Sequence, residues 1–150
     1  TVPQGEAASI AAAQPAAALP QEDAPLLGTS AWYVEDDPHT RAATCALLQR
    51  WGCSMPFAGP APDAIALATA GNAPQLVLLD VHLGSHYGPD VYAELCERWG
   101  SSPPVILLTA ERDSTLRRQA AERGWGFLAK PVRPPALRAL MSQTLLRMRE

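Results

Sequence analysis

The sequence has 150 residues, of which 47% are hydrophobic, and this size and composition suit one compact domain with a real core. Its formal net charge of -3 comes from the first 29 residues, which carry three acidic groups and no lysine or arginine, so the remaining 121 residues balance 12 acidic against 12 basic groups. Such a neutral domain gives no electrostatic reason to expect nucleic acid or an anionic membrane as a partner.

The three cysteines are odd in number and have no metal-like spacing, so we expect reduced thiols rather than a disulfide framework. Reduced thiols are typical of the cytoplasm. No apolar run in the sequence approaches the length of a transmembrane helix. We therefore expect a cytoplasmic domain with no direct membrane contact, although a longer parent protein could be membrane-anchored.

Residues 1–29 are rich in alanine and proline, and four prolines interrupt any helix that the alanines favour. This composition predicts a flexible linker. The chain begins with Thr1, and a linker at its front edge favours a piece of a longer protein over a trimmed start. We expect the folded domain to span residues 30–150.

From residue 30 onward, short apolar segments alternate five times with segments that have helical start and stop signals. The expected strands are 31–36, 53–58, 75–80, 103–110 and 125–130, and the expected helices are 38–51, 61–71, 88–100, 112–124 and 134–149. Asp37 and Pro38 are typical of an N-cap and a first helical residue. The expected inward stripe of that first helix is Ala43, Ala46, Leu47 and Trp51. The alternation predicts an α/β fold in which helices cover both faces of a parallel sheet.

Four of the five expected strands end in a polar side chain. These residues are Glu35 and Asp36, then Asp80, then Thr109, and finally Lys130, which is the only lysine in the chain. Ligands of open α/β sheets bind beyond the carboxyl ends of the strands. We therefore expect the polar strand ends to share one rim of the molecule.

Carboxylates that share such a rim need a cation. Two of them about 4 Å apart repel by roughly 4 kcal/mol at an effective dielectric constant of about 20. Oxygen ligands with no nearby cysteine favour a hard ion, so Mg²⁺ is the leading choice and Mn²⁺ its substitute. Lys130 would add a compact positive charge, and Thr109 a hydroxyl donor. A metal, an ammonium and a hydroxyl around Asp80 are what phosphoryl transfer to a carboxylate requires.

These segments resemble the receiver domain of two-component response regulators over residues 30–148. The stretch "VEDDP" is similar to the family's acidic pair, and "LLDVHLGSHYG" is similar to its phosphoacceptor segment, with a glycine at Gly88. The stretch "VILLTA" is similar to the segment that carries the family's hydroxyl residue. The stretch "FLAKPV" is similar to the segment that carries its lysine and proline, and the peptide bond between these two residues is often cis in the family. The resemblance implies a flavodoxin-like (βα)5 fold, a doubly wound five-stranded parallel sheet of strand order 2-1-3-4-5.

The resemblance also implies a role for each residue at the rim. Asp80 would be the phosphoacceptor, and Thr109 and Lys130 would be catalytic. Thr109 and Phe127 would form the conformational switch. The metal ligands would be Glu35, Asp36, Asp80 and the backbone carbonyl of His82.

The sequence departs from the family pattern at a few positions. Gly84 replaces the usual proline of the phosphoacceptor segment, so we expect a looser loop there. His82 and Glu111 occupy the two positions that the family uses to tune dephosphorylation, which leaves the lifetime of the phosphorylated state open. Phe127 lacks the hydroxyl of a tyrosine but can still move between exposed and buried states.

By resemblance, the domain would take a phosphoryl group from the phosphohistidine of a histidine kinase domain or a histidine phosphotransfer protein. It would then change the surface formed by the fourth helix, the fifth strand and the fifth helix. A homodimer is a separate candidate assembly. The isolated domain would be a self-phosphorylating acceptor rather than a conventional enzyme. The front linker and the "KPVRPPALRALM" ending resemble the C-terminal receiver of a bacterial hybrid sensor histidine kinase; a stand-alone regulator is the alternative.

Two other functions remain open at this point. A degenerate receiver would keep the fold as a protein-interaction module without being phosphorylated, although all the key residues are present. A haloacid-dehalogenase-type phosphatase also uses Asp, Thr and Lys on an α/β sheet. Such an enzyme would need a second Asp two residues after the nucleophile, where this chain has His82.

Overall fold

A computed structural model of the chain describes residues 26–110 and 114–148. Its main feature is one five-stranded sheet in the order β2-β1-β3-β6-β7, in which every neighbouring pair is parallel. The strands are β1 (Ser30–Val34), β2 (Ser54–Gly59), β3 (Leu76–Asp80), β6 (Val105–Thr109) and β7 (Gly126–Ala129). The predicted α/β fold and its strand order are confirmed.

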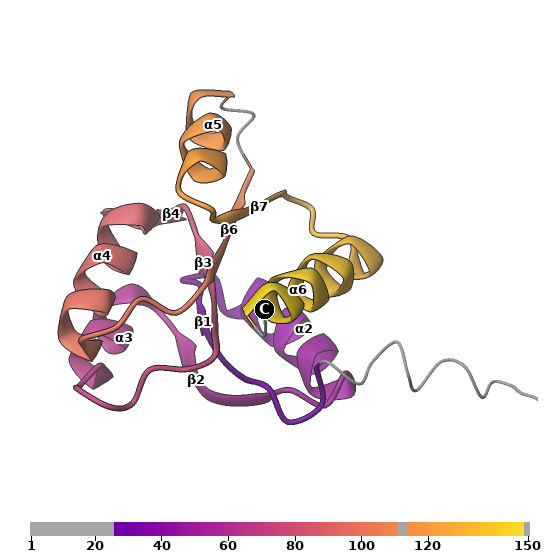
Figure 1. Ribbon diagram of the computed structural model, residues 1–150, viewed down its shortest axis with the longest axis horizontal. Helices are drawn as coiled ribbons and strands as arrows, with labels where there is room; N and C mark the ends of the chain where they lie inside the picture. The colour runs from indigo at the N-terminus through magenta and orange to yellow at the C-terminus, as the bar shows by residue number, and fades with distance from the viewer. Residues whose placement is uncertain (1–25, 111–113, 149–150) are drawn as a thin grey trace, which may run out of the picture.

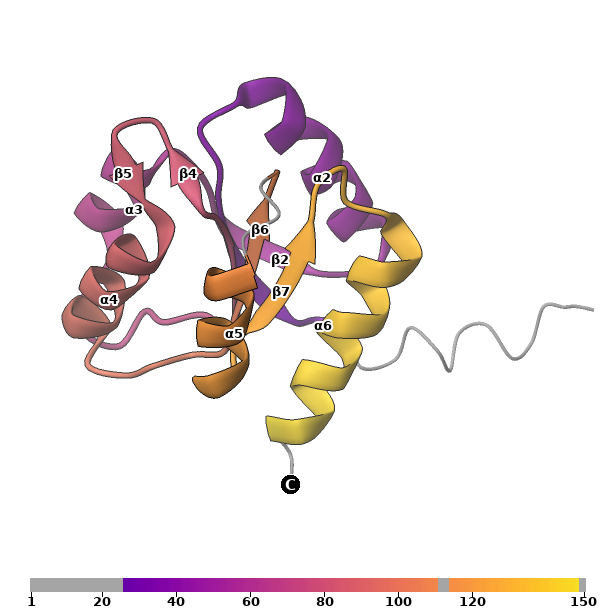
Figure 2. The ribbon, with the colours of Figure 1, turned by 90° about the horizontal axis from the view of Figure 1, so that it is seen from above.

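Helices cover both faces of this sheet. They are α2 (Pro38–Arg50), α3 (Ala61–Leu67), α4 (Gly88–Trp99), α5 (Ser114–Glu122) and α6 (Pro134–Met148). Figure 1 shows α3 and α4 on one side of the sheet and α2 and α6 on the other, and Figure 2 shows α5 next to the edge strand β7. The three central strands are buried on both faces, as their unbroken apolar runs require.

Two hydrophobic clusters form the core, one on each face of the sheet. Neighbouring strand residues alternate between them, because successive side chains of a strand point to opposite faces. Trp32 and Val34 belong to the cluster on the side of α3, α4 and α5. Tyr33 belongs to the cluster on the side of α2 and α6.

Helix α2 begins where the sequence predicts but buries a different face. The Asp37 carboxylate caps the helix by accepting a hydrogen bond from the Thr40 backbone N–H, with Pro38 in the first turn. The expected inward stripe is confirmed at Leu47 and Trp51, which pack in the core, and is wrong at Ala43 and Ala46, which are exposed. Leu48, outside the expected stripe, is the fully buried residue of the helix. Burying a leucine removes far more apolar surface from water than burying an alanine, and this decides the rotation of the helix.

Helix α3 ends at Leu67, four residues before the predicted end at residue 71. The side-chain amide of Asn72 donates a hydrogen bond to the Leu67 carbonyl oxygen at 3.0 Å and accepts one from the Thr69 N–H at 3.0 Å. An asparagine that satisfies the last carbonyl in this way offers the backbone an alternative to another helical turn.

The segment after β3 forms a hairpin that the sequence did not predict. Strands β4 (His82–Leu83) and β5 (His86–Tyr87) pair in antiparallel fashion across the turn residues Gly84 and Ser85. Gly84 has a φ of 61°, which glycine adopts without steric cost. The expectation of a looser loop is wrong, because a glycine at this position permits a tight two-residue turn.

Residues that precede β1 also pack against the folded domain. Leu26 is fully buried in the cluster beside α2 and α6, N-terminal of residue 30, where we expect the domain to begin. Gly28 donates a backbone hydrogen bond to Gly52 at 2.9 Å. Across the part of the chain that the structure describes, no helix combines the length and apolarity needed to span a bilayer.

Candidate functional site

The carboxyl ends of β1, β3, β6 and β7 lie side by side and bring the predicted polar residues to one rim. Glu35 and Asp36 follow β1, Asp80 and Thr109 are the last residues of β3 and β6, and Lys130 follows β7. Three of these side chains are withdrawn from solvent, with residue exposures of 2% for Glu35, 6% for Asp80 and 0% for Thr109. Buried polar groups at a strand end need partners, which the neighbouring strand ends supply.

Lys130 joins the two buried carboxylates. Its ammonium nitrogen lies 2.8 Å from Asp80 Oδ2 and 2.9 Å from Glu35 Oε1. The backbone N–H of Lys130 also donates to the Thr109 carbonyl oxygen at 2.7 Å, which fixes the start of the loop that follows β7. The Lys130–Pro131 peptide bond is cis. The rim therefore carries one ammonium held between acidic groups that are 45 residues apart in sequence.

Burial and ion pairing shift the pKa values of Glu35 and Lys130 in opposite directions. Burial raises the pKa of Glu35 above its usual value, although the hydrogen bond from Lys130 opposes the shift. Burial lowers the pKa of Lys130, but its hydrogen bonds to Asp80 and Glu35 outweigh burial, and the net pKa is raised. The ammonium consequently stays charged at neutral pH and offsets the negative charge at the rim.

Asp36 is the acidic residue of the rim with a buried oxygen that lacks a hydrogen-bond donor. Its Oδ1 atom is buried and has no hydrogen-bond partner. The turn of the β4–β5 hairpin lies directly against it, since a Cβ atom at Gly84 would come within 2.9 Å of Asp36 Oδ2. A buried carboxylate oxygen without a donor is costly unless a cation or water completes the site.

The donor set fits a hard divalent cation held by few protein atoms. Asp36 offers its unpartnered Oδ1, while the Oδ1 atom of Asp80 accepts one hydrogen bond, from the His82 N–H at 3.2 Å. Within residues 26–110 and 114–148, no three side chains of His, Cys, Asp or Glu are grouped as a metal cluster. The carboxylates of Asp36 and Asp80 and the main-chain carbonyl of His82 would fill only some of the coordination positions of Mg²⁺. Water and phosphate oxygens would take the others, which is how Mg²⁺ is usually bound.

Gly88 brings the end of the β4–β5 hairpin close to the main chain of β3. A Cβ atom at this position would lie 2.5 Å from the Asp80 carbonyl oxygen and 2.8 Å from Val81 Cα, distances that no side chain tolerates. The Gly88 N–H donates to the Val81 carbonyl oxygen at 2.6 Å. The glycine that the family pattern requires is thus needed here for close approach between backbones.

Comparison with known families decides the identity of the fold. The sequence model of the response regulator receiver domain matches residues 32–142, which is most of the chain. The chain belongs to the response regulator receiver domain family. It is a receiver domain of two-component signalling. No curated protein is similar enough in sequence to count as a relative.

Solved receiver domains share the fold at low sequence identity. The BeF3-activated receiver domain of DrrB is 24% identical, with 81% of this chain and 100% of that chain covered and a TM-score of 0.66. The receiver domain of a Pseudomonas aeruginosa sensor histidine kinase, with a magnesium ion in its active-site cleft, is 22% identical, with 79% and 98% covered and a TM-score of 0.66. A CheY-like receiver domain from Methanospirillum hungatei is 19% identical, with 81% and 97% covered and a TM-score of 0.70.

The predicted switch residues of the receiver domain lie on neighbouring strands. Thr109 is fully buried, and Phe127 is half-buried on β7. The guanidinium carbon of Arg117 lies 5.2 Å from the centre of the Phe127 ring, so a cation–π contact joins α5 to this strand. His82 is exposed on the hairpin beside Asp80, and Glu111 lies outside the described residues.

Two residues at the rim were not singled out from the sequence. The Arg41 guanidinium donates to the Glu35 carbonyl oxygen at 2.6 Å and ties the first turns of α2 to the end of β1. The Tyr33 hydroxyl lies 3.4 Å from Glu35 Oε1. Tyr33 could have been found from the alternation of β1, because residues two apart in a strand share a face.

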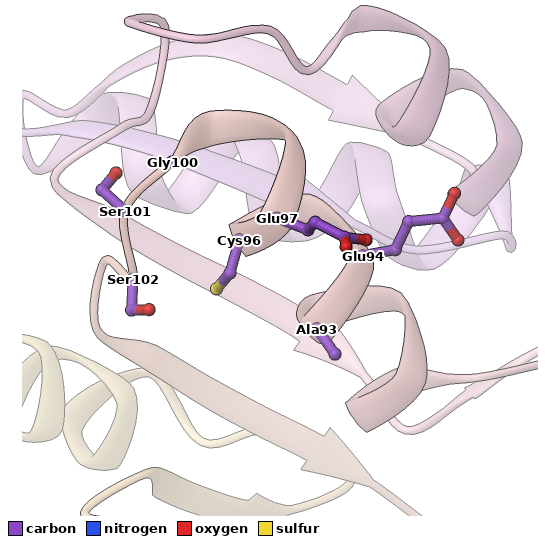
Figure 3. Close-up of a pocket in the computed structure, with 7 residues that line it drawn as sticks. All are labelled: Ala93, Glu94, Cys96, Glu97, Gly100, Ser101 and Ser102. Atoms are coloured by element: carbon purple, nitrogen blue, oxygen red, sulfur yellow. The ribbon is translucent and has the colours of Figure 1, made fainter.

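A hollow of about 640 Å³ lies along the C-terminal half of α4 and the loop after it (Figure 3). It is lined by Ala93, Glu94, Cys96, Glu97, Gly100, Ser101 and Ser102. Helix α4 starts beside Asp80 and runs away from it, so this hollow lies toward the far end of a helix about 18 Å long. Its glutamates are exposed, and Glu94 pairs with Arg98 at 3.7 Å. We therefore place the chemistry at the strand ends and not in this hollow.

Proposed function

We propose that this receiver domain accepts a phosphoryl group on Asp80 from the phosphohistidine of a histidine kinase domain or a histidine phosphotransfer protein, in a Mg²⁺-dependent reaction. The observation that carries the proposal is the environment of Asp80. Its carboxylate is buried at the rim with an ammonium at 2.8 Å on one oxygen, next to an acidic neighbour whose oxygen has no donor.

In the transfer, an Asp80 carboxylate oxygen attacks phosphorus, and the bond between phosphorus and the donor nitrogen breaks. The donor imidazole leaves with the electron pair of that bond, and an acyl phosphate forms on Asp80. Lys130 would stabilise the phosphoryl oxygens, and the Thr109 hydroxyl would donate to them. A bound Mg²⁺ ion would neutralise negative charge on the phosphoryl oxygens. Asp36, Asp80 and the carbonyl of His82 would hold the ion, whereas Glu35, the remaining ligand that the resemblance implies, pairs with Lys130.

The alternative functions are less well supported. His82, where a phosphatase would need its second carboxylic acid, is exposed on the hairpin and donates its backbone N–H to Asp80. A degenerate receiver would lack at least one group of the rim, whereas Lys130 here contacts both Glu35 and Asp80.

The output surface and the parent protein are proposed from the resemblance to receiver domains. We propose that phosphorylation changes the surface of α5, β7 and α6, the part of this chain that corresponds to the family's output surface. One solved neighbour is the receiver domain of a sensor histidine kinase. By the resemblance of its sequence, we propose a parent of the hybrid histidine kinase type, with the domain in the bacterial cytoplasm.

The test is incubation of the chain with acetyl phosphate and Mg²⁺, followed by intact-mass measurement. We expect a gain of one phosphoryl group that is lost with EDTA and in Asp80→Asn. Asp90→Asn is the matched control, because Asp90 is exposed in the first turn of α4, and this variant should be phosphorylated like the wild type. No gain in the wild type, together with no Mg²⁺ binding, would favour the degenerate receiver.

A further inference from the structure

Tyr33 carries a buried hydroxyl within reach of the rim. The residue is 1% exposed in the core beside α2 and α6, and its hydroxyl lies 3.4 Å from Glu35 Oε1. Alternation along β1 places Tyr33 and Glu35 on the same face of the sheet. Burial raises the pKa of Tyr33 above its usual range, so the phenol stays protonated and can donate to the carboxylate.

The Glu35 carboxylate is held by donors from this chain. Its Oε1 atom lies near both the Lys130 ammonium at 2.9 Å and the Tyr33 hydroxyl, and its Oε2 atom accepts from the Asp37 N–H at 3.3 Å. These donors distinguish Glu35 from Asp36, whose buried Oδ1 has none. The geometry therefore makes Glu35 an anchor for the ammonium.

Packing alone does not hold Lys130 at Asp80. Its side chain is 22% exposed and borders two hollows of about 300 and 270 Å³. Tyr33 lines the first of these hollows together with Thr40 and Thr44. A flexible lysine stem with free space beside it has other rotamers available. Hydrogen bonds to Glu35 and Asp80 must therefore select the one that reaches the reacting carboxylate.

We propose that Tyr33 is a positioning residue for phosphoryl transfer: its hydroxyl orients the Glu35 carboxylate, which in turn holds the Lys130 ammonium at Asp80. The proposal rests on the phosphoacceptor function proposed above. It adds to the rim a group that belongs to the core and contacts neither Asp36 nor Asp80. Its partner Glu35, which the family resemblance names as a metal ligand, has both oxygens engaged by Tyr33, Lys130 and the Asp37 N–H.

The decisive variant is Tyr33→Phe, which removes one oxygen atom and keeps the ring in the core. At saturating Mg²⁺, we expect phosphorylation by acetyl phosphate to be about 3- to 10-fold slower, because a hydrogen bond to a charged group is lost. The dissociation constant for Mg²⁺, measured by calorimetry, should stay within about twofold of the wild type, because Asp36 and Asp80 are unchanged.

Tyr92→Phe is the matched control. Tyr92 is also buried, and its hydroxyl donates to the Pro103 carbonyl oxygen on the other face of the sheet. A loss of one buried hydroxyl there should change stability by a similar amount and leave the phosphorylation rate at the wild-type value. Equal slowing in both variants would mean a general effect of destabilisation and would overturn the positioning role.

A second readout uses the fact that Lys130 is the only lysine of the chain. With 15N-labelled lysine, the side-chain ammonium gives a single NMR signal, which Tyr33→Phe should shift or broaden and Tyr92→Phe should not. A wild-type phosphorylation rate in Tyr33→Phe overturns the proposal whatever this signal does. If the wild type itself takes up no phosphate, the phosphoacceptor function fails, and an unchanged ammonium signal then rejects the positioning role separately.

Discussion

At the scale of single residues, the site depends on where glycine allows the backbone to approach a carboxylate. Gly84 lies at a hairpin turn with a φ of 61° and leaves just enough room for the Asp36 carboxylate. A side chain at Gly88 would strike the main chain of Asp80. Both glycines stand where the chain folds back over the rim, so they determine the space in which a cation and a phosphoryl group would be bound.

We predict that Gly84→Ala weakens Mg²⁺ binding by about tenfold, because the new Cβ atom pushes against a carboxylate oxygen of Asp36 and displaces a ligand. Gly28→Ala is the control, since Gly28 has a φ of 75° and nothing within 4 Å of the added atom. Both variants should lose about 1–2 kcal/mol of folding stability from the left-handed conformation. Calorimetric titration separates the two effects, and equal Mg²⁺ affinities would contradict the role of Gly84.

At the scale of elements, local signals in the sequence predict where strands and helices begin better than which way a helix faces. The Asp37 cap and the Pro38 start of α2 depend on neighbouring residues and were predictable. The rotation that buries Leu48 depends on the shape of the core above the sheet, which periodicity alone does not supply. The early end of α3 needed the contact of Asn72 with a carbonyl five residues before it.

We predict that Leu48→Ala lowers the free energy of unfolding by about 2–5 kcal/mol, because Leu48 is fully buried and its removal leaves a cavity. Ala46→Ser, at an exposed position on the same helix, should change it by less than about 0.5 kcal/mol. Urea unfolding followed by circular dichroism measures both. A larger effect at Ala46 than at Leu48 would restore the inward stripe expected from the sequence.

The rim shows the same division between what was and was not predictable. Residues at the ends of parallel strands meet at one edge, so the convergence of Glu35, Asp80 and Lys130 followed from the strand pattern alone. Which oxygen each donor contacts depends on side-chain rotamers. The contacts of Tyr33 and Arg41 with Glu35 are of this kind. Alternation along β1 places Tyr33 on the face of Glu35 but does not say that their side chains touch, and Arg41 had no spacing signal at all.

At the scale of the whole molecule, one route leads from the rim to the outer surface. Phe127 lies within β7 and Lys130 directly follows this strand. Arg117 of α5 stacks on Phe127 at 5.2 Å, and Arg123, directly after α5, stacks on Trp125, directly before β7, at 5.0 Å. Each such contact contributes about 0.5–1 kcal/mol at an exposed position. We expect such contacts to break if phosphate binding moves Thr109 or Lys130, and α5 would then be displaced from β7.

We predict that phosphorylation shifts backbone NMR signals of α5, β7 and α6 as well as those of the rim. Phe127→Leu removes the ring beneath Arg117. In this variant, the shift changes at the rim should remain, and those in α5 should fall to less than about half of their wild-type size. Shift changes that stay confined to the ends of β1 and β3 in the wild type would count against transmission through β7.

The most direct test of the central claim is to locate the phosphate. After reaction with acetyl phosphate and Mg²⁺, borohydride reduces an aspartyl phosphate to homoserine, and peptide sequencing by mass spectrometry identifies the position. The structure predicts homoserine at position 80 and at no other aspartate, and none when EDTA is present. Modification at Asp36 or Asp37 with Asp80 intact, or phosphorylation that persists in EDTA, would contradict the account.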